Sequence, residues 1–320
     1  GAGVSVLALL GSGLVLFGLF GADYWEGKSE TVKVFFKGGA MGLADIVPGV
    51  SGGTIALITG IYDRLITAIA SIEPSLLLDL VKGDLKGAKR KFLDIDFSFL
   101  LPLVVGIGIA FYLASKFIVF AMTEFRVFTF SFFFGLIFAS ALSIYSRIGS
   151  DSFLSVILTS LLGFGLAFFV VGWEELALSH TYPITFVSGS IAICAMILPG
   201  ISGAFMLLLL GQYDFMLTSL LNFTARWPYL AVFGAGAAVS LLTFSRAVRY
   251  LLENYRYPTL GFLAGLMLGA LRLTLQEVLG RPGFLQDPLA VAGSLVSGAV
   301  AVLLVYITSR KYDLPYDGDF

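Results

Sequence analysis

The stretch Ile46-Val47-Pro48-Gly49-Val50-Ser51-Gly52 recurs 151 positions later as Ile197-Leu198-Pro199-Gly200-Ile201-Ser202-Gly203. Each copy lies in the middle of a long apolar run, where an unbroken helix would otherwise form. Proline removes a backbone donor and clashes with the preceding turn, so each run must break there. In a bilayer such a break survives only where protein or a water-filled cavity satisfies the freed backbone groups. Paired broken helices in two halves of a chain therefore predict a transporter with its substrate site at the breaks.

The composition indicates a polytopic membrane protein. Hydrophobic residues make up 58% of the 320 residues and charged residues 13%, with a mean hydropathy of +0.94. A soluble domain carries about twice that charged fraction. The single cysteine, Cys194, and the single histidine, His180, exclude an intrachain disulfide and argue against a metal site built on Cys or His clusters. We expect no metal, no cofactor and no nucleic-acid partner.

Apolar segments of about 20 residues, the length that crosses a bilayer, predict seven spanning helices. They lie at roughly 4–22, 98–120, 127–147, 152–172, 228–250, 258–279 and 287–308. The two runs that contain the Pro-Gly breaks, 32–72 and 182–221, are each expected to form a re-entrant helical hairpin.

A second set of matching residues, at an offset of 130, extends the repeat beyond the hairpins. Each repeat is a hairpin followed by three spans, and because three is odd, the second repeat must enter the membrane from the opposite face. The fold expected is an all-α membrane protein with inverted repeats. Its parts are an N-terminal transmembrane helix and linker at 1–30, a first repeat at 31–172, a second repeat at 182–308 and a tail at 309–320.

Charge predicts the orientation of this topology. Fifteen of the 20 Lys and Arg residues fall on one side, which the positive-inside rule assigns to the cytoplasm. That side includes the C-terminus and the charged loop 73–97, an insertion of about 21 residues that is expected to lie as an amphipathic segment on the inner surface.

The two breaks are the expected substrate site. The helix that follows each break begins with free N–H groups, glycine lets the backbone approach a ligand, and serine adds a hydroxyl, so the geometry suits phosphate or carboxylate. The alternative is that Gly and Pro kink the helices only for packing. The expected binding residues are Pro48, Gly49, Ser51, Gly52, Gly53, Thr54, Pro199, Gly200, Ser202 and Gly203.

Five basic residues in or beside spans are candidates for the ligand's counter-charge, because intramembrane cations are costly. The alternative for those near span ends is snorkelling to the interface. The candidates are Lys116, Arg126, Arg246, Arg256 and Arg272.

Asp45, three residues before Pro48, is the candidate ion-coupling residue. A carboxylate near the tip could take up a proton or help to bind a cation. Its counterpart in the second half is Met196, so the site is expected to be asymmetric. The alternative is an aspartate bonded to the broken backbone. Asp63 and Asp214 are expected to have structural roles, in capping or in pairing with a base.

The runs 38–54 (GGAMGLADIVPGVSGGT), 60–65 (GIYDRL) and 198–203 (LPGISG) resemble the signatures of a prokaryotic membrane family associated with polyprenyl-phosphate transport, the PopT-type undecaprenyl phosphate translocases. The resemblance implies a flippase in the plasma membrane that returns undecaprenyl phosphate from the outer to the inner leaflet. Such recycling serves cell-wall synthesis, and we expect transport to be coupled to a proton or sodium gradient.

Two other functions remain open from the residues alone. A membrane phosphatase for polyprenyl diphosphate could also use inverted repeats with re-entrant hairpins, although such an enzyme needs a nucleophile or base near an arginine. A carrier of a small soluble organic anion would differ in whether its site opens sideways to lipid.

Overall fold

The computed structural model of this protein describes residues 29–47, 50–146, 148, 153–176 and 178–311. The predicted span at 4–22 and the tips Pro48 and Gly49 lie outside these residues. The described part is all helical. The first half contains α3 (Glu30–Asp45), α4 (Gly52–Ile58), α5 (Tyr62–Ala70), α6 (Ser75–Lys82), α7 (Leu85–Leu93), α8 (Phe97–Glu124), α9 (Arg126–Tyr145) and α10 (Phe153–Val171). The second half contains α11 (Tyr182–Ile197), α12 (Gly203–Leu209), α13 (Tyr213–Leu221), α14 (Phe223–Asn254), α15 (Arg256–Leu279), a short 3-10 helix (Phe284–Gln286) and α16 (Pro288–Lys311).

Five of the described helices, α9, α10, α14, α15 and α16, are long and apolar enough to cross a membrane. The number rises to eight if each of three bent helix pairs is counted as one span. One of these pairs joins α7 to the first part of α8, with a bend of 67°. A multi-pass membrane protein is therefore the architecture that the structure supports.

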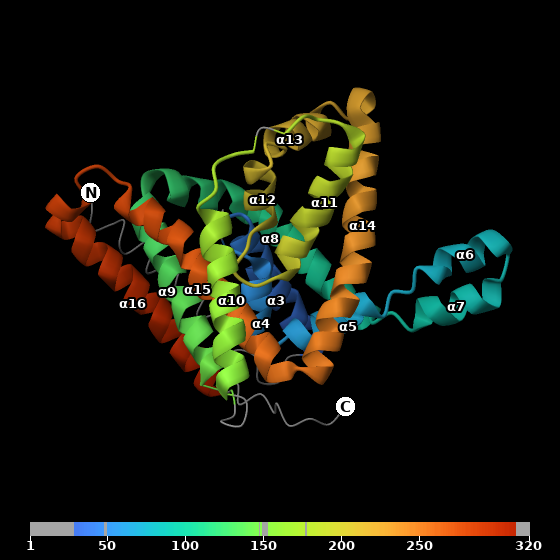
Figure 1. The fold of residues 1–320 in the computed structure, drawn as a ribbon, viewed down its shortest axis with the longest axis horizontal. Coiled ribbons are helices and arrows are strands. Elements are labelled where there is room, and N and C mark those ends of the chain that lie inside the picture. The colour runs from blue at the N-terminus through green and yellow to red at the C-terminus, as the bar shows by residue number, and fades with distance from the viewer. Residues whose placement is uncertain (1–28, 48–49, 147, 149–152, 177, 312–320) are drawn as a thin grey trace.

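Each half packs its first helix on its long helix through the same positions. α3 lies against α8, and α11 lies against α14 (Figure 1). At each contact a glycine faces the main chain of the partner, so that a methyl group there would overlap it: Gly38 on Leu103 and Gly106 on Phe35 in the first half, Gly189 on Phe233 and Gly236 on Phe186 in the second. Such contacts are how membrane helices approach closely. The positions match at the offsets of 151 and 130 that the sequence predicts.

The last two helices of each half pack against the last two helices of the other half. α9 packs against α16, α10 packs against α15, and α9 and α15 pack against each other (Figure 1). Glycine again sets the distance, because Gly135 faces Gly298 and Gly265 faces Ser160. The two halves are thus interlocked rather than side by side. The opposite orientation of the two repeats in a membrane stays a prediction.

The returning limb of each hairpin differs from the single helix that we expected. It consists of two helices with a sharp bend between them, 118° from α4 to α5 and 107° from α12 to α13. Gly60 and Gly211 stand at the bends with φ of 71° and 65°. At Gly60, the Ile61 N–H donates to the Ala56 carbonyl, as in the glycine-terminated ends of many helices. A residue with a side chain would cost roughly 1–2 kcal/mol in this left-handed conformation.

The core includes the first break and the middle of α15. Val47 and Val50 beside the first break are fully buried, as are Leu266 and Met267 on α15. By contrast, α10 leaves most of its apolar side chains exposed, including Leu158 and Leu162. A soluble protein rarely exposes so large an apolar surface, so we expect this surface to face lipid.

Candidate functional site

The two breaks contact each other in the interior of the protein. The Ser51 hydroxyl donates to the Leu198 carbonyl at 3.1 Å, and the Gly200 N–H donates to the Thr54 hydroxyl oxygen at 2.9 Å. Ser51 and Thr54 are almost completely buried. The predicted binding residues from two distant parts of the chain are therefore neighbours in space.

The first tip is closed by its own carboxylate. Asp45, at the end of α3, accepts a hydrogen bond of 2.7 Å from the Gly52 N–H, which is the first N–H of α4. The Ser51 oxygen accepts from Gly53 N–H at 3.1 Å. Donors that we expected to face a ligand are thus engaged by protein groups in this conformation. This arrangement matches the alternative reading of Asp45, an acid bonded to the broken backbone.

The other end of α4 is also held by α3. Lys37, two turns before Asp45, donates from Nζ to the Thr59 carbonyl at 2.9 Å. An acid at the N-terminus and a base at the C-terminus both complement a helix dipole. Lys37 is not among the predicted site residues, although a lysine two turns before a tip aspartate within an apolar run is a visible signal.

The second tip has no such charges. Met196 stands where the first tip has Asp45, and Met196 is 43% exposed. The Ser202 oxygen accepts a long hydrogen bond, 3.5 Å, from the Phe205 N–H. Gly200 has a φ of 90° and lies against α15, where an added Cβ would come within 2.7 Å of the Met267 Cα.

The motif glycines of both tips lie against protein. An added Cβ on Gly53 would come within 2.8 Å of the Ile197 carbonyl oxygen, and one on Gly203 would come within 2.6 Å of the Ala192 oxygen. Gly53 therefore permits the close approach of the two tips. A role for these glycines toward a ligand requires the tips to separate.

Arg272 lies beyond the tips on α15. Its Nη1 donates to the Phe168 carbonyl at 2.8 Å, and its guanidinium carbon lies 4.5 Å from the centre of the Phe168 ring. Phe168 belongs to the last turn of α10, so Arg272 satisfies a free carbonyl there. Arg272 follows Met267 by five residues, or about 7.5 Å along the helix axis.

The other basic candidates also bond groups outside the tips. Arg246 donates to the Ile72 carbonyl at 2.6 Å, just after α5. Arg256 forms an ion pair of 2.9 Å with Asp63, and Arg126 forms one with Glu277. The side chain of Lys116 lies outside the described residues. In this conformation the described arginines hold helix ends and do not converge on one point.

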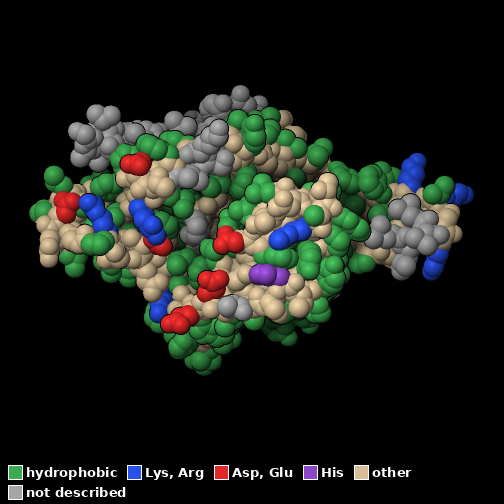
Figure 2. Space-filling view, turned by 90° about the horizontal axis from the view of Figure 1, so that it is seen from above, with side chains coloured by type: hydrophobic (Ala, Val, Ile, Leu, Met, Phe, Trp, Pro, Cys, Tyr) green, Lys and Arg blue, Asp and Glu red, His purple; other side chains and the backbone are tan. Residues whose placement is uncertain are grey.

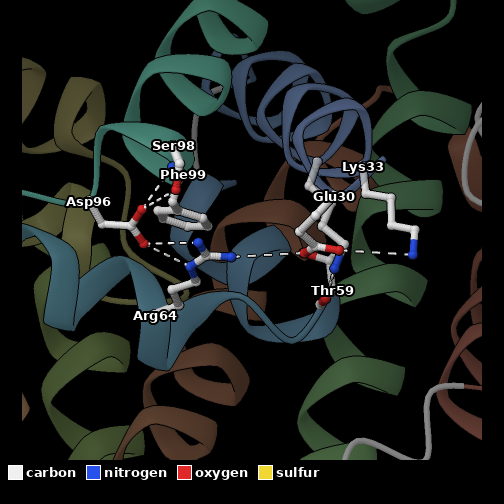
Figure 3. A network of polar contacts seen from close by, with 8 residues as sticks. Glu30, Lys33, Thr59, Arg64, Asp96, Ser98 and Phe99 are labelled. Atoms are coloured by element: carbon white, nitrogen blue, oxygen red, sulfur yellow. Dashed lines mark hydrogen bonds and ion pairs between the residues drawn. The ribbon is translucent and has the colours of Figure 1, made fainter. Parts of the chain in front are cut away.

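The base of the first hairpin contains a polar network (Figure 3). Arg64 on α5 forms an ion pair of 2.9 Å with Asp96 and a longer one, 3.9 Å, with Glu30. Burial alone would raise the pKa of Asp96, but hydrogen bonds from Ser98 and Arg64 outweigh it and hold that pKa below its ordinary value. The network ties the beginnings of α3 and α8 to α5.

Within the residues that the structure describes, no group of three or more His, Cys, Asp or Glu side chains could hold a metal ion. The polar groups at the tips are backbone donors, hydroxyls and one carboxylate. This set can bind an anionic group by hydrogen bonds once the donors are released, and it can exchange a proton at Asp45.

Comparison with known proteins adds the following. Residues 41–279 match a family described as undecaprenyl phosphate translocase-like. A protein of Vibrio cholerae named polyprenyl-phosphate transporter is 43% identical over 240 residues, which cover 75% of this chain and 76% of the relative. A Staphylococcus aureus protein of the same name is 31% identical over 256 residues, covering 73% of this chain and 83% of the relative. No solved structure matches.

Proposed function

The chain belongs to the undecaprenyl phosphate translocase-like family, and from this premise we propose that it is a membrane transporter of undecaprenyl phosphate or a related polyprenyl phosphate. The direction we propose is from the outer to the inner leaflet of a prokaryotic plasma membrane, with the C-terminus in the cytoplasm, so that the carrier lipid is recycled. The two relatives named as polyprenyl-phosphate transporters support a transporter over a phosphatase.

The contact between the two tips is the observation that carries the site. Ser51 and Thr54 from one repeat bond Leu198 and Gly200 from the other, in the middle of the two broken runs. A site shared by two repeats can change its access when one repeat moves relative to the other, which is how many carriers with inverted repeats work.

In our proposal the structure represents the closed state of the tips. Separation of the tips would free the Gly200 N–H and the Ser51 hydroxyl, both of which now bond protein groups. The phosphoryl oxygens would replace these partners, while the isoprenoid tail stays in lipid beside exposed apolar faces such as that of α10.

Asp45 would supply the ion coupling. Its carboxylate now bonds the Gly52 N–H, which is a donor that an incoming phosphate needs. An ionised Asp45 would also repel the phosphate. Protonation would remove that repulsion and weaken the bond to Gly52, so that loading and proton uptake would be linked.

A transport assay in proteoliposomes tests the proposal. We expect the purified protein to move labelled undecaprenyl phosphate between leaflets and to leave small soluble organic phosphates on their original side. Transport of the soluble phosphates would favour the carrier of small anions. Release of inorganic phosphate from undecaprenyl diphosphate would favour the membrane phosphatase. Either of these two results would contradict a protein that only transports the lipid phosphate.

A further inference from the structure

The first half carries a helical pair that the second half lacks. α6 and α7 form a hairpin at the insertion between α5 and α8, and the pair projects sideways from the body, across the direction of α14 (Figure 1). Gly83, with a φ of 76°, makes the turn, and the Asp84 carboxylate caps α7 by accepting from the Gly87 N–H at 3.0 Å. The pair is therefore an ordered element with its own internal contacts.

Most of the acidic side chains of this pair are used inside it. Asp79 of α6 accepts from Lys91 of α7 at 2.6 Å, and Glu73 forms a second ion pair with the same lysine at 3.5 Å. Lys91 is accordingly only 16% exposed. Ala88, on the same side of α7, is buried. This side of α7 therefore faces α6.

The opposite side of α7 combines apolar and basic side chains. Leu85, Phe92 and Leu93 are exposed by 69%, 51% and 67%. With Lys89 they occupy positions i, i+4, i+7 and i+8, which share one face of a helix. Lys86 and Arg90 follow at the edge of this face, and the three basic side chains are exposed. Seen from the end of the molecule where α13 lies, Lys and Arg side chains surround the far end of the projection (Figure 2).

We propose that this face of α7 binds the surface of a bilayer that contains anionic lipids. The leucines and the phenylalanine would enter the interface, and Lys86, Lys89 and Arg90 would contact acidic headgroups. Such amphipathic helices bind through apolar area together with attraction to anionic lipid. Each Lys or Arg close to an anionic surface adds about fivefold to the affinity, so three add roughly a hundredfold.

The direction in which the pair projects indicates that the partner of this face of α7 is a lipid surface and not an acidic protein in the cytoplasm. Since α14 is long enough to cross the membrane, an element that extends across its direction runs along the plane of the bilayer. The acids within the pair offset only part of the charge of this face. Asp79 and Glu73 are paired with Lys91 and Asp84 caps α7, so the exposed Asp94 at the end of α7 stands against three basic side chains.

The full chain in lipid nanodiscs provides the test. With Cys194 replaced by serine, a single cysteine at Leu85 would carry a bimane label, and lipids with a nitroxide near the headgroup would quench it. One set of discs would contain phosphatidylcholine only and the other one part phosphatidylglycerol to three parts phosphatidylcholine. We expect at least threefold stronger quenching in the discs with phosphatidylglycerol.

Two variants complete the design. The triple variant K86E/K89E/R90E should reduce the quenching in anionic discs to the level seen in phosphatidylcholine, whereas K86R/K89R/R90K should keep it. A label at Leu158 on α10 should be equally quenched in all discs. Equal quenching of the Leu85 label in both lipids, or quenching that survives the charge reversal, overturns the proposal. Protection of the label by an added acidic protein, with no effect of the lipid, also overturns it.

Discussion

The two hairpins have the same order of helices but are held by different side chains. In the first, α4 is held at one end by Asp45 and at the other by Lys37, both from α3. In the second, Met196 and Ser188 occupy the corresponding positions, and the Ser188 hydroxyl bonds the Ile184 carbonyl of its own helix. The repeat therefore supplies two similar scaffolds, and a few polar substitutions give one of them additional hydrogen bonds between its helices.

The returning limbs differ in the same direction. α5 packs against α14 of the other half, and its Asp63 pairs with Arg256 at the beginning of α15 in that half. α13 packs against α14 of its own half, and Asp214, the counterpart of Asp63, is exposed. The first hairpin is thus joined to both halves and the second mainly to its own. This difference predicts that the second hairpin moves more easily during transport.

Replacement of Asp45 should have the largest effect. Asp45→Met, which copies the second tip, leaves the Gly52 N–H without its partner, so we expect a stability loss of about 1–3 kcal/mol and no transport. Asp45→Asn keeps an acceptor oxygen and should bind substrate but lose the response to an ion gradient. Thermal unfolding and transport with and without an imposed pH gradient measure both. An Asp45→Asn protein that still follows the gradient would exclude Asp45 as the coupling residue.

The double variant Ser51→Ala with Ser202→Ala should reduce transport by more than tenfold. Each hydroxyl bonded to a charged headgroup contributes about 1.5–3 kcal/mol. Ser188→Ala is the matched control, because this buried hydroxyl lies in the second hairpin but bonds only its own helix. Unchanged transport by the folded double variant would remove both serines from the site.

Breaking the pair between Asp63 and Arg256 should loosen the first hairpin. The pair is about 30% exposed, so we expect Asp63→Asn to cost about 1 kcal/mol. The exchange Asp63→Arg with Arg256→Asp should recover part of that loss. Arg126 and Asp214 are the repeat counterparts of Arg256 and Asp63. If the hairpins alternate in role, cysteines that replace Arg126 and Asp214 should cross-link only during turnover, in the Cys194→Ser background. A cross-link of equal yield without substrate would contradict this exchange.

The arginines should fall into two classes with smaller effects. Arg272→Ala should weaken undecaprenyl phosphate binding severalfold and remove the bond to the α10 end, and Arg246→Ala and Arg256→Ala should have lesser effects. Arg249 is paired with Glu253 on the surface, so Arg249→Ala should do little. Equal effects of all four substitutions on binding would assign the arginines to folding.

Acid should loosen the base of the first hairpin slightly. Because the pKa of Asp96 is lowered in the folded protein, its stabilising contribution is present above the ordinary aspartate value near 3.9 and is lost as the pH falls below it. The temperature of thermal unfolding should therefore decrease once the pH drops below about 4, and this decrease should be less steep for Asp96→Asn. An identical acid response of variant and parent would show that the network contributes nothing measurable.

Several features of the fold could be predicted from local rules. Proline followed by glycine in the middle of an apolar run predicts a helix break, so the two broken runs followed from the sequence. Pro102 and Pro228 stand near the beginnings of α8 and α14, and those helices continue through them. Thr129 and Thr259 match at the offset of 130, and they occupy equivalent turns, because each hydroxyl bonds a carbonyl eight residues earlier, in Ala121 and Leu251. The bends at Gly60 and Gly211 were not predicted, because a repeated glycine does not by itself show a positive φ.

What the sequence determined by itself was therefore the positions of breaks and repeats, because they depend on backbone constraints within a few residues. Only the tertiary structure decided which partners bond the backbone N–H and C=O groups that the helix breaks leave free. The Gly200 N–H is bonded by Thr54, 146 residues away, and a ligand donor is indistinguishable from a structural donor until its neighbours are known. Likewise, Asp63 and Arg256 became partners only because α5 crosses to the other half, which no local pattern specifies.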